Sequence, residues 1–588
     1  MLIDRLRRSL PFVFYGVVAA WYSAPLFDSP DGLGILDWDQ HLFYYGSVIK
    51  SLFEYHQLPF WNPWYCGGNV LWQNPQVPLL TPVIPLVAVM SLPLAMKVNI
   101  ALHYWVGLVG FHLLLHRSLG VRSRSVVAGL SAVGVLSGAM AMHLTVGHSV
   151  FLPVLYLPLQ LHFVIQGIRT RAVRPFMWAA IPLALMIWNG ALHAVPISLA
   201  AVGFVSLGAA VAQRRVMPLV AAALVATLGF AYSAPKLLPI SLFVTSDQFF
   251  DARPAIEHPD AMSAEMVTRA YLDRYQYRNL RFAGQRSGWY EYGNYIGGFA
   301  AIVIAGAMIL AFAVPRTDER WLGFALATAT LLFLLMSAGE FSAWAPASLA
   351  RLVPLFSSFR IPSRYTFGVV VMGIATAGWA WRALSGEAPL PAPVRLMAGA
   401  LCLLAALDVG AQTREHFVGV FNGDAFPRSL FPRRAGPDTP PTTDASGNPY
   451  GPGSPMLHSL VKDTDFWGCY EPLLLQRTAN PSLPYLAGDG GARISDVHFS
   501  PNRIDFSLIA GRDTTRLALN QNGAPGWSSS AGAVTPLQDA GMAIAVTPGQ
   551  AGRYVLRFTP PGLWAGVAIL LAAVAASIAG RGRQLPDR

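Results

Sequence analysis

Apolar runs of about 20 residues recur along this chain and are separated by short polar loops, and this constrains the fold more than any other feature. A helix of that length crosses about 30 Å of hydrocarbon, whereas a membrane β-barrel would show alternating segments of about 10 residues. We therefore expect a polytopic α-helical membrane protein with about twelve transmembrane helices. The expected spans are residues 10–27, 97–116, 125–143, 149–168, 175–189, 193–212, 217–233, 296–314, 321–337, 365–384, 394–411 and 562–580.

The basic residues predict the orientation of these spans. They fall at alternate ends of successive runs, and the positive-inside rule places those ends, and with them both termini, in the cytoplasm. Charged residues are only 12% of the chain. The net charge of +11 mostly reflects this placement of basic residues at the predicted cytoplasmic ends. The arginines are scattered over loop ends, which gives no reason to expect a nucleic-acid partner. They are Arg5, Arg7, Arg8, Arg117, Arg122, Arg124, Arg169, Arg171, Arg174, Arg214, Arg215, Arg316, Arg320, Arg382, Arg581 and Arg583.

This topology divides the chain into three parts. Residues 1–411 form the transmembrane domain, with outer loops 28–96, 234–295 and 338–364. Residues 412–561 also lie outside, and short alternating stretches such as 503–509 and 553–558 predict a β-sandwich after a linker around residues 437–455. Residues 562–588 form the last span and a cytoplasmic tail. The Pro-rich stretch 78–93 is too short to span, so we expect an interfacial or re-entrant element.

The three cysteines carry little information about function. Cys402 lies in an apolar span, where a small buried residue is expected. Cys66 and Cys469 are both predicted outside, where an oxidising compartment would permit a disulfide between the first loop and the β-rich domain.

The first outer loop carries the best candidates for catalysis. Asp37 and Asp39 follow the first apolar run, and an ionisable group so close to a bilayer is costly unless it serves a site. A carboxylate there can act as a general base or bind a divalent cation. Asp39 is the first choice because it directly precedes the polar and aromatic run 40–45, with Asp37 as its helper. Gln40, Trp61 and Asn62 are candidate substrate contacts, although aromatic residues are also common at membrane interfaces.

Other predicted outer ends supply further candidates for substrate binding. Lys236, Arg360 and Arg364 are cations on the side where the positive-inside rule disfavours them, and an anionic ligand such as a phosphate would explain their presence. The alternative for these cations is lipid headgroup contact or a structural ion pair. The remaining candidates are His143, His148, His193, Glu291 and Tyr292, and for Glu291 pairing with Arg281 or Arg286 is equally open. No His-Glu-x-x-His pattern occurs, so we assign no metal ligand and expect no tightly held zinc.

Several short motifs, taken in order, resemble the YfhO-like branch of the GT-C superfamily of membrane glycosyltransferases. The resemblance covers nearly the whole chain, and it lies in the order of the motifs rather than in any single one. After an Asp that follows the first helix, the motifs are Pro59–Pro63 with Gly67 and Gly68, Gly147 with His148, Glu291 with Tyr295–Gly297, Phe359–Arg364, Ser500–Arg503 and Ala524–Trp527.

This resemblance implies a GT-C-like enzyme of the bacterial inner (cytoplasmic) membrane, with its site facing the periplasm or exterior. It would move a sugar from a polyprenyl-phosphate donor to a glycan, lipid or protein acceptor, with membrane lipids around it. The first-loop acid would be the base or a metal ligand; no cofactor is assigned, and a divalent cation, Mg or Mn, is left open. A transporter or flippase of lipid-linked glycans, and a non-catalytic scaffold for envelope assembly, are the alternatives.

Overall fold

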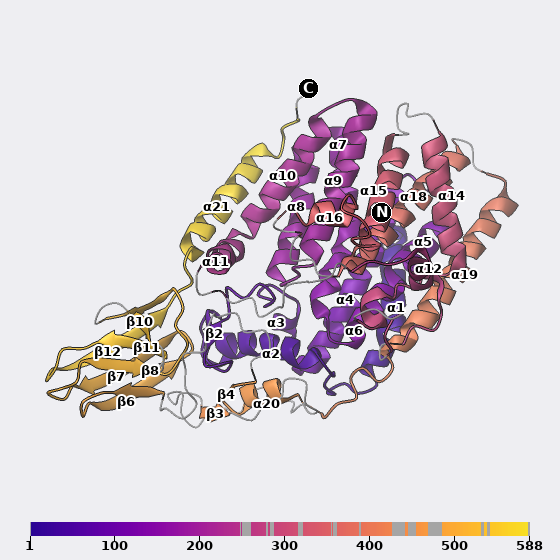
Figure 1. Cartoon of the computed structure of the whole chain (residues 1–588). Coiled ribbons are helices and arrows are strands. Elements are labelled where there is room, and N and C mark those ends of the chain that lie inside the picture. The colour runs from indigo at the N-terminus through magenta and orange to yellow at the C-terminus, as the bar shows by residue number, and fades with distance from the viewer. Residues whose placement is uncertain are drawn as a thin grey trace.

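The computed structural model shows a bundle of helices joined to a strand-rich region at one end (Figure 1). The residues described are 2–246, 249, 260–277, 280–282, 287–314, 321–353, 356, 361–386, 390–425, 442–444, 454–468, 485–530, 534–537 and 541–585.

The helical elements, including short 3₁₀ and π turns labelled η, follow one another along the whole chain. They are α1 (Leu2–Ser23), η1 (Ala24–Phe27), α2 (Trp38–Ile49), η2 (Lys50–Glu54), α3 (Val83–Leu86), α4 (Leu92–His112), η3 (Leu113–Ser118), α5 (Arg124–Leu136), α6 (Gly138–Thr145), η4 (Ser149–Tyr156), α7 (Leu157–Thr170), α8 (Val173–Trp188), α9 (Ala194–Gln213), α10 (Met217–Tyr232), α11 (Ala234–Val244), α12 (Ala264–Leu272), α13 (Trp289–Tyr292), α14 (Gly298–Ala313), α15 (Trp321–Ser337), α16 (Pro346–Ala350), η6 (Pro362–Tyr365), α18 (Thr366–Ser385), α19 (Ala392–Arg414), η7 (Glu415–Phe417), α20 (Pro455–Val461) and α21 (Leu563–Gly580).

Each predicted span coincides largely with one helix or with two consecutive helical elements, such as α5 and α6 for residues 125–143, and the helices differ in length. In the described part of the chain, eight are long and apolar enough to cross a membrane, or nine if α10 and α11, bent by 86° at their junction, count as one span. Three more, α8, α14 and α15, are apolar but have only 16, 16 and 17 residues. The expected number of about twelve spans therefore stays a prediction. The stretch 78–93 contains the four-residue helix α3 and the start of α4, not a spanning helix of its own.

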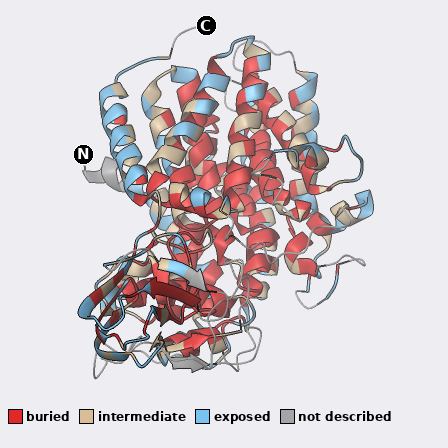
Figure 2. Ribbon diagram, turned by 60° about the vertical axis from the view of Figure 1, so that its left-hand side comes forward, coloured by how far each residue is buried: buried red, intermediate tan, exposed pale blue. Residues whose placement is uncertain are grey.

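The outer helices of the bundle carry many exposed residues (Figure 2), and a large number of these are apolar. Only 22% of α21 is buried, yet its sequence is apolar throughout, and Trp564, Leu571 and Ile578 are exposed. Such a helix is stable when hydrocarbon surrounds its exposed sides. The chain thus has the helices of a multi-pass membrane protein.

Two loop ends predicted to be cytoplasmic lie side by side. Ala172, between α7 and α8, forms an isolated β-bridge with Gln584, which follows α21. The backbone N–H of Leu585 donates to the carbonyl of Arg171 over 2.8 Å. The first of these ends and the chain terminus are therefore on the same side of the bundle, as the distribution of basic residues predicts.

The strand-rich region consists of two four-stranded antiparallel sheets. The first has the order β10-β11-β8-β5, the second β6-β7-β12-β9, and residues of both sheets, such as Leu519 and Phe506, share one hydrophobic core. The predicted strand 503–509 coincides with β7, and 553–558 lies within β12. The strands are β1 (Trp61–Asn62), β2 (Asn69–Val70), β3 (Thr442–Asp444), β4 (Thr464–Phe466), β5 (Leu486–Gly488), β6 (Arg493–Ser500), β7 (Arg503–Ile509), β8 (Arg516–Leu519), β9 (Trp527–Ser529), β10 (Val534–Leu537), β11 (Gly541–Ala545) and β12 (Ala551–Phe558).

The first outer loop joins the helices to this strand-rich region. Trp61 is fully buried in the core of the sheets, where its ring lies 5.3 Å from that of Trp527. The backbone N–H of Cys66 donates to the carbonyl of Phe466, in β4, over 2.8 Å. Cys66 is disulfide-bonded, whereas Cys402 is free and buried, as expected. Cys469, the predicted partner of Cys66, and most of the predicted linker lie outside the described residues.

Candidate functional site

Six polar side chains meet where several helices end on one side of the bundle, and we call them the polar cluster. Hydrogen bonds and ion pairs join them in two hydrogen-bonded chains of three side chains each. Both of these chains contact the ring of Phe151 or a residue that stacks on it. The members are Asp37 before α2, His143 in α6, His148 before η4, His193 before α9, Glu291 in α13 and Arg364 in η6.

The first chain runs from Asp37 through His148 to His143. Nε2 of His148 lies 3.1 Å from Oδ2 of Asp37, and its Nδ1 lies 2.9 Å from Nδ1 of His143. A carboxylate can only accept, so Nε2 of His148 carries the proton, and in the neutral ring Nδ1 accepts from Nδ1–H of His143. The carboxylate thereby fixes the tautomer and the orientation of the His148 ring.

The start of α2 is held against the end of α6, and this places Asp37 beside the histidines. The backbone N–H of Asp37 donates to the carbonyl of Val146 over 3.0 Å, and Nε1 of Trp38 donates to the carbonyl of Leu144 over 2.9 Å. Between them Gly147 has a φ of 102°, and a Cβ at this position would lie 2.2 Å from the backbone nitrogen of Trp38. Only glycine permits both the backbone conformation and the close approach.

The second chain runs from Glu291 through Arg364 to His193. Arg364 donates from Nη2 to Oε1 of Glu291 over 2.5 Å and from Nε to Oε2 over 2.8 Å, a bidentate pair. Its Nη1 lies 3.0 Å from Nε2 of His193, which must accept because a guanidinium only donates. Burial favours the neutral acid, but the Arg364 charge and hydrogen bonds outweigh it and lower the pKa of Glu291 to about 2. The carboxylate is therefore ionised at neutral pH.

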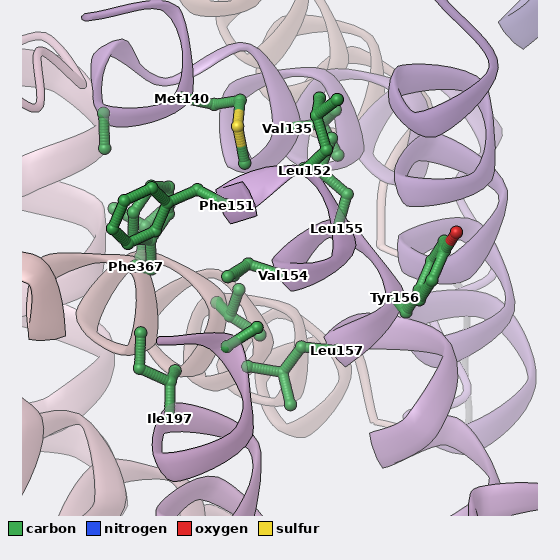
Figure 3. Packing of buried hydrophobic residues seen from close by; sticks show 14 of the residues in the cluster. Val135, Met140, Phe151, Leu152, Val154, Leu155, Tyr156, Leu157, Ile197 and Phe367 are labelled. Atoms are coloured by element: carbon green, nitrogen blue, oxygen red, sulfur yellow. The ribbon is translucent and has the colours of Figure 1, made fainter. Parts of the chain in front are cut away.

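Phe151 packs between the two chains. Its ring stacks on His143 at 4.1 Å and on His193 at 5.0 Å, and the guanidinium of Arg364 lies 5.2 Å from its centre. Figure 3 shows it against Phe367 among buried apolar side chains. One side of the cluster is therefore apolar, which lowers the local dielectric constant and strengthens the electrostatic interactions within the cluster.

Asp39, the first choice from the sequence, does not contact the polar cluster through any of its described hydrogen bonds. Its two carboxylate oxygens accept the backbone N–H groups of Met456 and Leu457, each over 3.0 Å, at the start of α20. Only 3% of the residue is exposed, and burial raises the pKa of its carboxyl to about 6, although the two backbone bonds act in the opposite direction. Asp39 thus stabilises the first turn of a short helix.

Lys236 also has structural partners. Its Nζ is fully buried and donates to the backbone carbonyls of Val77, Ile187 and Trp188, over 2.6, 2.9 and 3.4 Å. An ammonium has three protons, so these carbonyls can use its whole donor capacity. This arrangement holds the first outer loop against the end of α8. It favours a structural role for Lys236 over phosphate binding.

The other predicted contacts are spread over the first outer loop and α13. Gln40 donates from Nε2 to the hydroxyl of Tyr44 over 2.9 Å, and Trp61 donates from Nε1 to Oε1 of Gln521 over 2.9 Å. Asn62 is buried and accepts the backbone N–H of Trp64 over 3.1 Å. Tyr292 donates its hydroxyl to Oδ2 of Asp260 over 2.8 Å. Arg360 lies outside the described residues.

Three members of the polar cluster could hold a metal ion. One ligand atom each from His143, His148 and Glu291 lies within 4.8 Å of the other two. Two imidazoles and a carboxylate suit a transition metal such as zinc or manganese better than magnesium. The ion would have to compete with Arg364 for Glu291, since Arg364 engages both carboxylate oxygens.

Two residues near the cluster have no distinct sequence signal. Phe151 is one of 32 phenylalanines in a mostly apolar chain, and nothing local marks it. Tyr290 lies next to Glu291, and its ring is 6.0 Å from that of His148. Burial and the charges of Glu291 and Asp37 raise the pKa of Tyr290, so it stays a neutral donor. Glu291 pairs with Arg364, whereas the sequence suggests Arg281 or Arg286 as partners, of which Arg286 lies outside the described residues.

No protein-family model and no curated protein matches the sequence. Among solved structures, the chain is similar to the arabinofuranosyltransferase AftD from Mycobacteria, with 14% identity and a TM-score of 0.43 over 69% of this chain. A mutant form of AftD matches with 15% identity and a TM-score of 0.38 over 68% of the chain. The matched part spans 27% of either AftD chain. The resemblance to the YfhO-like branch stays a prediction.

Proposed function

We propose that this chain is a membrane glycosyltransferase that moves a sugar from a polyprenyl-phosphate donor to an acceptor hydroxyl outside the cytoplasm. One observation supports this most: a carboxylate–imidazole pair and a buried arginine lie in one cluster at the ends of membrane helices. A transfer of this type needs a base for the acceptor and a cation for the departing phosphate.

In the proposed step, the acceptor oxygen attacks the anomeric carbon of the sugar. The new C–O bond forms as the bond from that carbon to the phosphate oxygen breaks, and the phosphate leaves with the electron pair. The hydroxyl proton passes to the carboxylate of Asp37, which Nε2–H of His148 holds in place. Arg364 offsets the negative charge that develops on the phosphate, and Glu291 holds the guanidinium in place.

The assignment of the base thereby moves from Asp39 to Asp37. The side chain of Asp37 is 20% exposed and that of its partner His148 is 14% exposed, so a substrate can reach both. The carboxylate of Asp39 is bonded to the α20 backbone on both oxygens. The polyprenyl-phosphate donor, the sugar and the acceptor hydroxyl belong to the same proposal.

A divalent cation is a further open element of the proposal. If one takes part, His143, His148 and Glu291 are its proposed ligands. Such a cation would supply a second positive charge next to the leaving phosphate. Chelation with EDTA followed by addition of Mg²⁺, Mn²⁺ or Zn²⁺ tests this directly, because cation-dependent activity would disappear and return with the preferred ion.

A transporter is the rival with a specific observation in its favour. The 86° bend between α10 and α11 resembles the broken helices that carry substrate sites in transporters. The bend, however, is held by Lys236, which donates to three carbonyls of neighbouring segments. We therefore keep transport as an outcome of the test below.

The test uses the purified full-length chain in detergent with a panel of polyprenyl-phosphate-linked sugars, and it measures released polyprenyl phosphate. We expect release by the wild type, and a loss of about 100-fold or more in Asp37→Asn and Arg364→Gln. Asp28→Asn is the matched control, since Asp28 is an exposed acid of the same outer loop. Full activity in both Asp37→Asn and Asp39→Asn would contradict catalysis by either acid, and lipid movement without bond cleavage would identify a transporter.

A further inference from the structure

A cavity of about 670 Å³ lies at the opposite end of the bundle from the polar cluster. It is formed where α5 and α19 begin and α18 ends. α18 starts beside Arg364 and ends at Ser385, which lines the cavity. At 1.5 Å per residue the two sites are about 30 Å apart. The cavity is therefore a separate site.

The cavity is strongly basic. Four arginines from three segments line it, and none of its described lining residues is acidic. Arg124 and Arg395 are exposed, whereas Arg382 is half-buried and donates from Nη1 to the carbonyl of Gly386. The fourth is Arg122. Guanidinium groups arranged in this way match the oxygens of a phosphate.

Two helix N-termini add to the positive potential. α5 begins at Arg124 and α19 at Ala392, both residues of the cavity wall. The residues that precede them, Ser123 and Pro391, provide no side-chain cap, so the first backbone N–H groups keep their donor capacity, except at Pro393 of α19, which has no N–H. The N-terminal end of a helix attracts anions through these groups and through its dipole.

We propose that this cavity binds a phosphate-bearing anion at the side of the membrane predicted to be cytoplasmic. The phosphate belongs either to the headgroup of an anionic phospholipid or to a soluble molecule, because both present the same chemistry to the arginines. A cavity of this volume holds a headgroup-sized ligand. Basic recesses between membrane helices on this side commonly bind anionic headgroups.

The test uses the purified full-length chain in two sets of conditions. In the first, the chain is placed in phosphatidylcholine nanodiscs with and without phosphatidylglycerol. In the second, inorganic pyrophosphate is titrated into the chain in neutral detergent. Thermal melting and native mass spectrometry report stabilisation and retained ligand. We expect the wild type to be stabilised by at least one probe, and the apparent affinity to fall about tenfold or more in Arg124→Gln/Arg395→Gln.

The matched control is Arg581→Gln/Arg583→Gln, which removes the same charge from exposed residues outside the cavity on the same predicted side. Stabilisation by phosphatidylglycerol alone identifies a lipid headgroup, and stabilisation by pyrophosphate alone identifies a soluble phosphate. Arg382→Lys, which keeps the charge, shows whether guanidinium geometry matters. Equal stabilisation of the wild type and Arg124→Gln/Arg395→Gln, or no response of the wild type to either probe, overturns the proposal.

Discussion

Asp37 and Asp39 are separated by one residue, yet their carboxylates have different partners. Asp37 contacts an imidazole across 111 residues of sequence, whereas Asp39 accepts two backbone N–H groups more than 400 residues away. Successive helical residues point in different directions, and this divides the pair between two environments.

This division predicts opposite effects of the same substitution. Asp37→Asn removes the carboxylate partner of His148, so we expect transfer activity to fall about 100-fold with unchanged thermal stability. Asp39→Asn places an amide donor against one of two backbone donors, so we expect a loss of about 1–3 kcal/mol in stability and normal activity per folded molecule. Activity assays and thermal melts of both variants check this, and the reverse pattern would restore Asp39 as the base.

The buried carboxyl of Asp39 also predicts a pH dependence of stability. Its pKa is about 6 in the folded chain, against about 3.9 for an unfolded aspartate. The folded state binds this proton more tightly, so the contribution to stability is complete below about pH 4 and disappears as the pH rises through about 6.

We therefore expect wild-type stability to decline between about pH 4 and 6, by up to about 3 kcal/mol from this group. Asp39→Asn has no such carboxyl and should decline less over the same range. Thermal melts at a series of pH values measure the difference between the two proteins, and parallel curves would count against the assignment.

At the scale of elements, α20 and β4 dock on α2 through charged contacts at both ends. Asp39 binds the start of α20, and Lys50 pairs with Asp463, after α20, over 2.9 Å and with Glu54 over 3.0 Å. Lys50 is only 1% exposed, and two helices approach closely at Gly46, where a Cβ would lie 2.7 Å from Leu460. The segment 454–468 thus depends on α2 for its position.

Lys50→Met should loosen this segment. The substitution keeps the volume but leaves two buried carboxylates without the ammonium, which costs about 3–5 kcal/mol. Limited trypsin digestion of the folded chain should then cut after Lys462 faster than in the wild type, and mass spectrometry of the fragments reports this. Lys462→Gln provides the control, because it removes the cleavage site itself.

At the scale of the whole molecule, the strand-rich region and the exposed, basic C-terminal tail are predicted to lie on opposite sides of the membrane. The last span, α21, joins them directly. Its apolar, exposed surface is suited to a position in hydrocarbon.

The low cysteine content allows a direct test of this orientation. Cys402 is buried and Cys66 is disulfide-bonded, so both should react poorly with maleimides. We expect a membrane-impermeant maleimide to label Ser495→Cys in intact spheroplasts, and Gly582→Cys only after lysis, because both positions are exposed and are predicted to lie on opposite sides of the membrane. Labelling of Gly582→Cys before lysis would reverse the predicted orientation.

The sequence by itself determined where the membrane helices and the strands β7 and β12 lie, because span length and alternation are local properties of the chain. The tertiary structure decided the roles of individual polar residues. Arg364 donates to Glu291, which is 73 residues earlier in the sequence, and Lys236 donates to the carbonyl of a residue that is 159 residues earlier. Hydrogen-bond partners that are so far apart leave no periodic pattern in the sequence. Packing between distant helices decides whether a charged side chain binds backbone groups or faces a site.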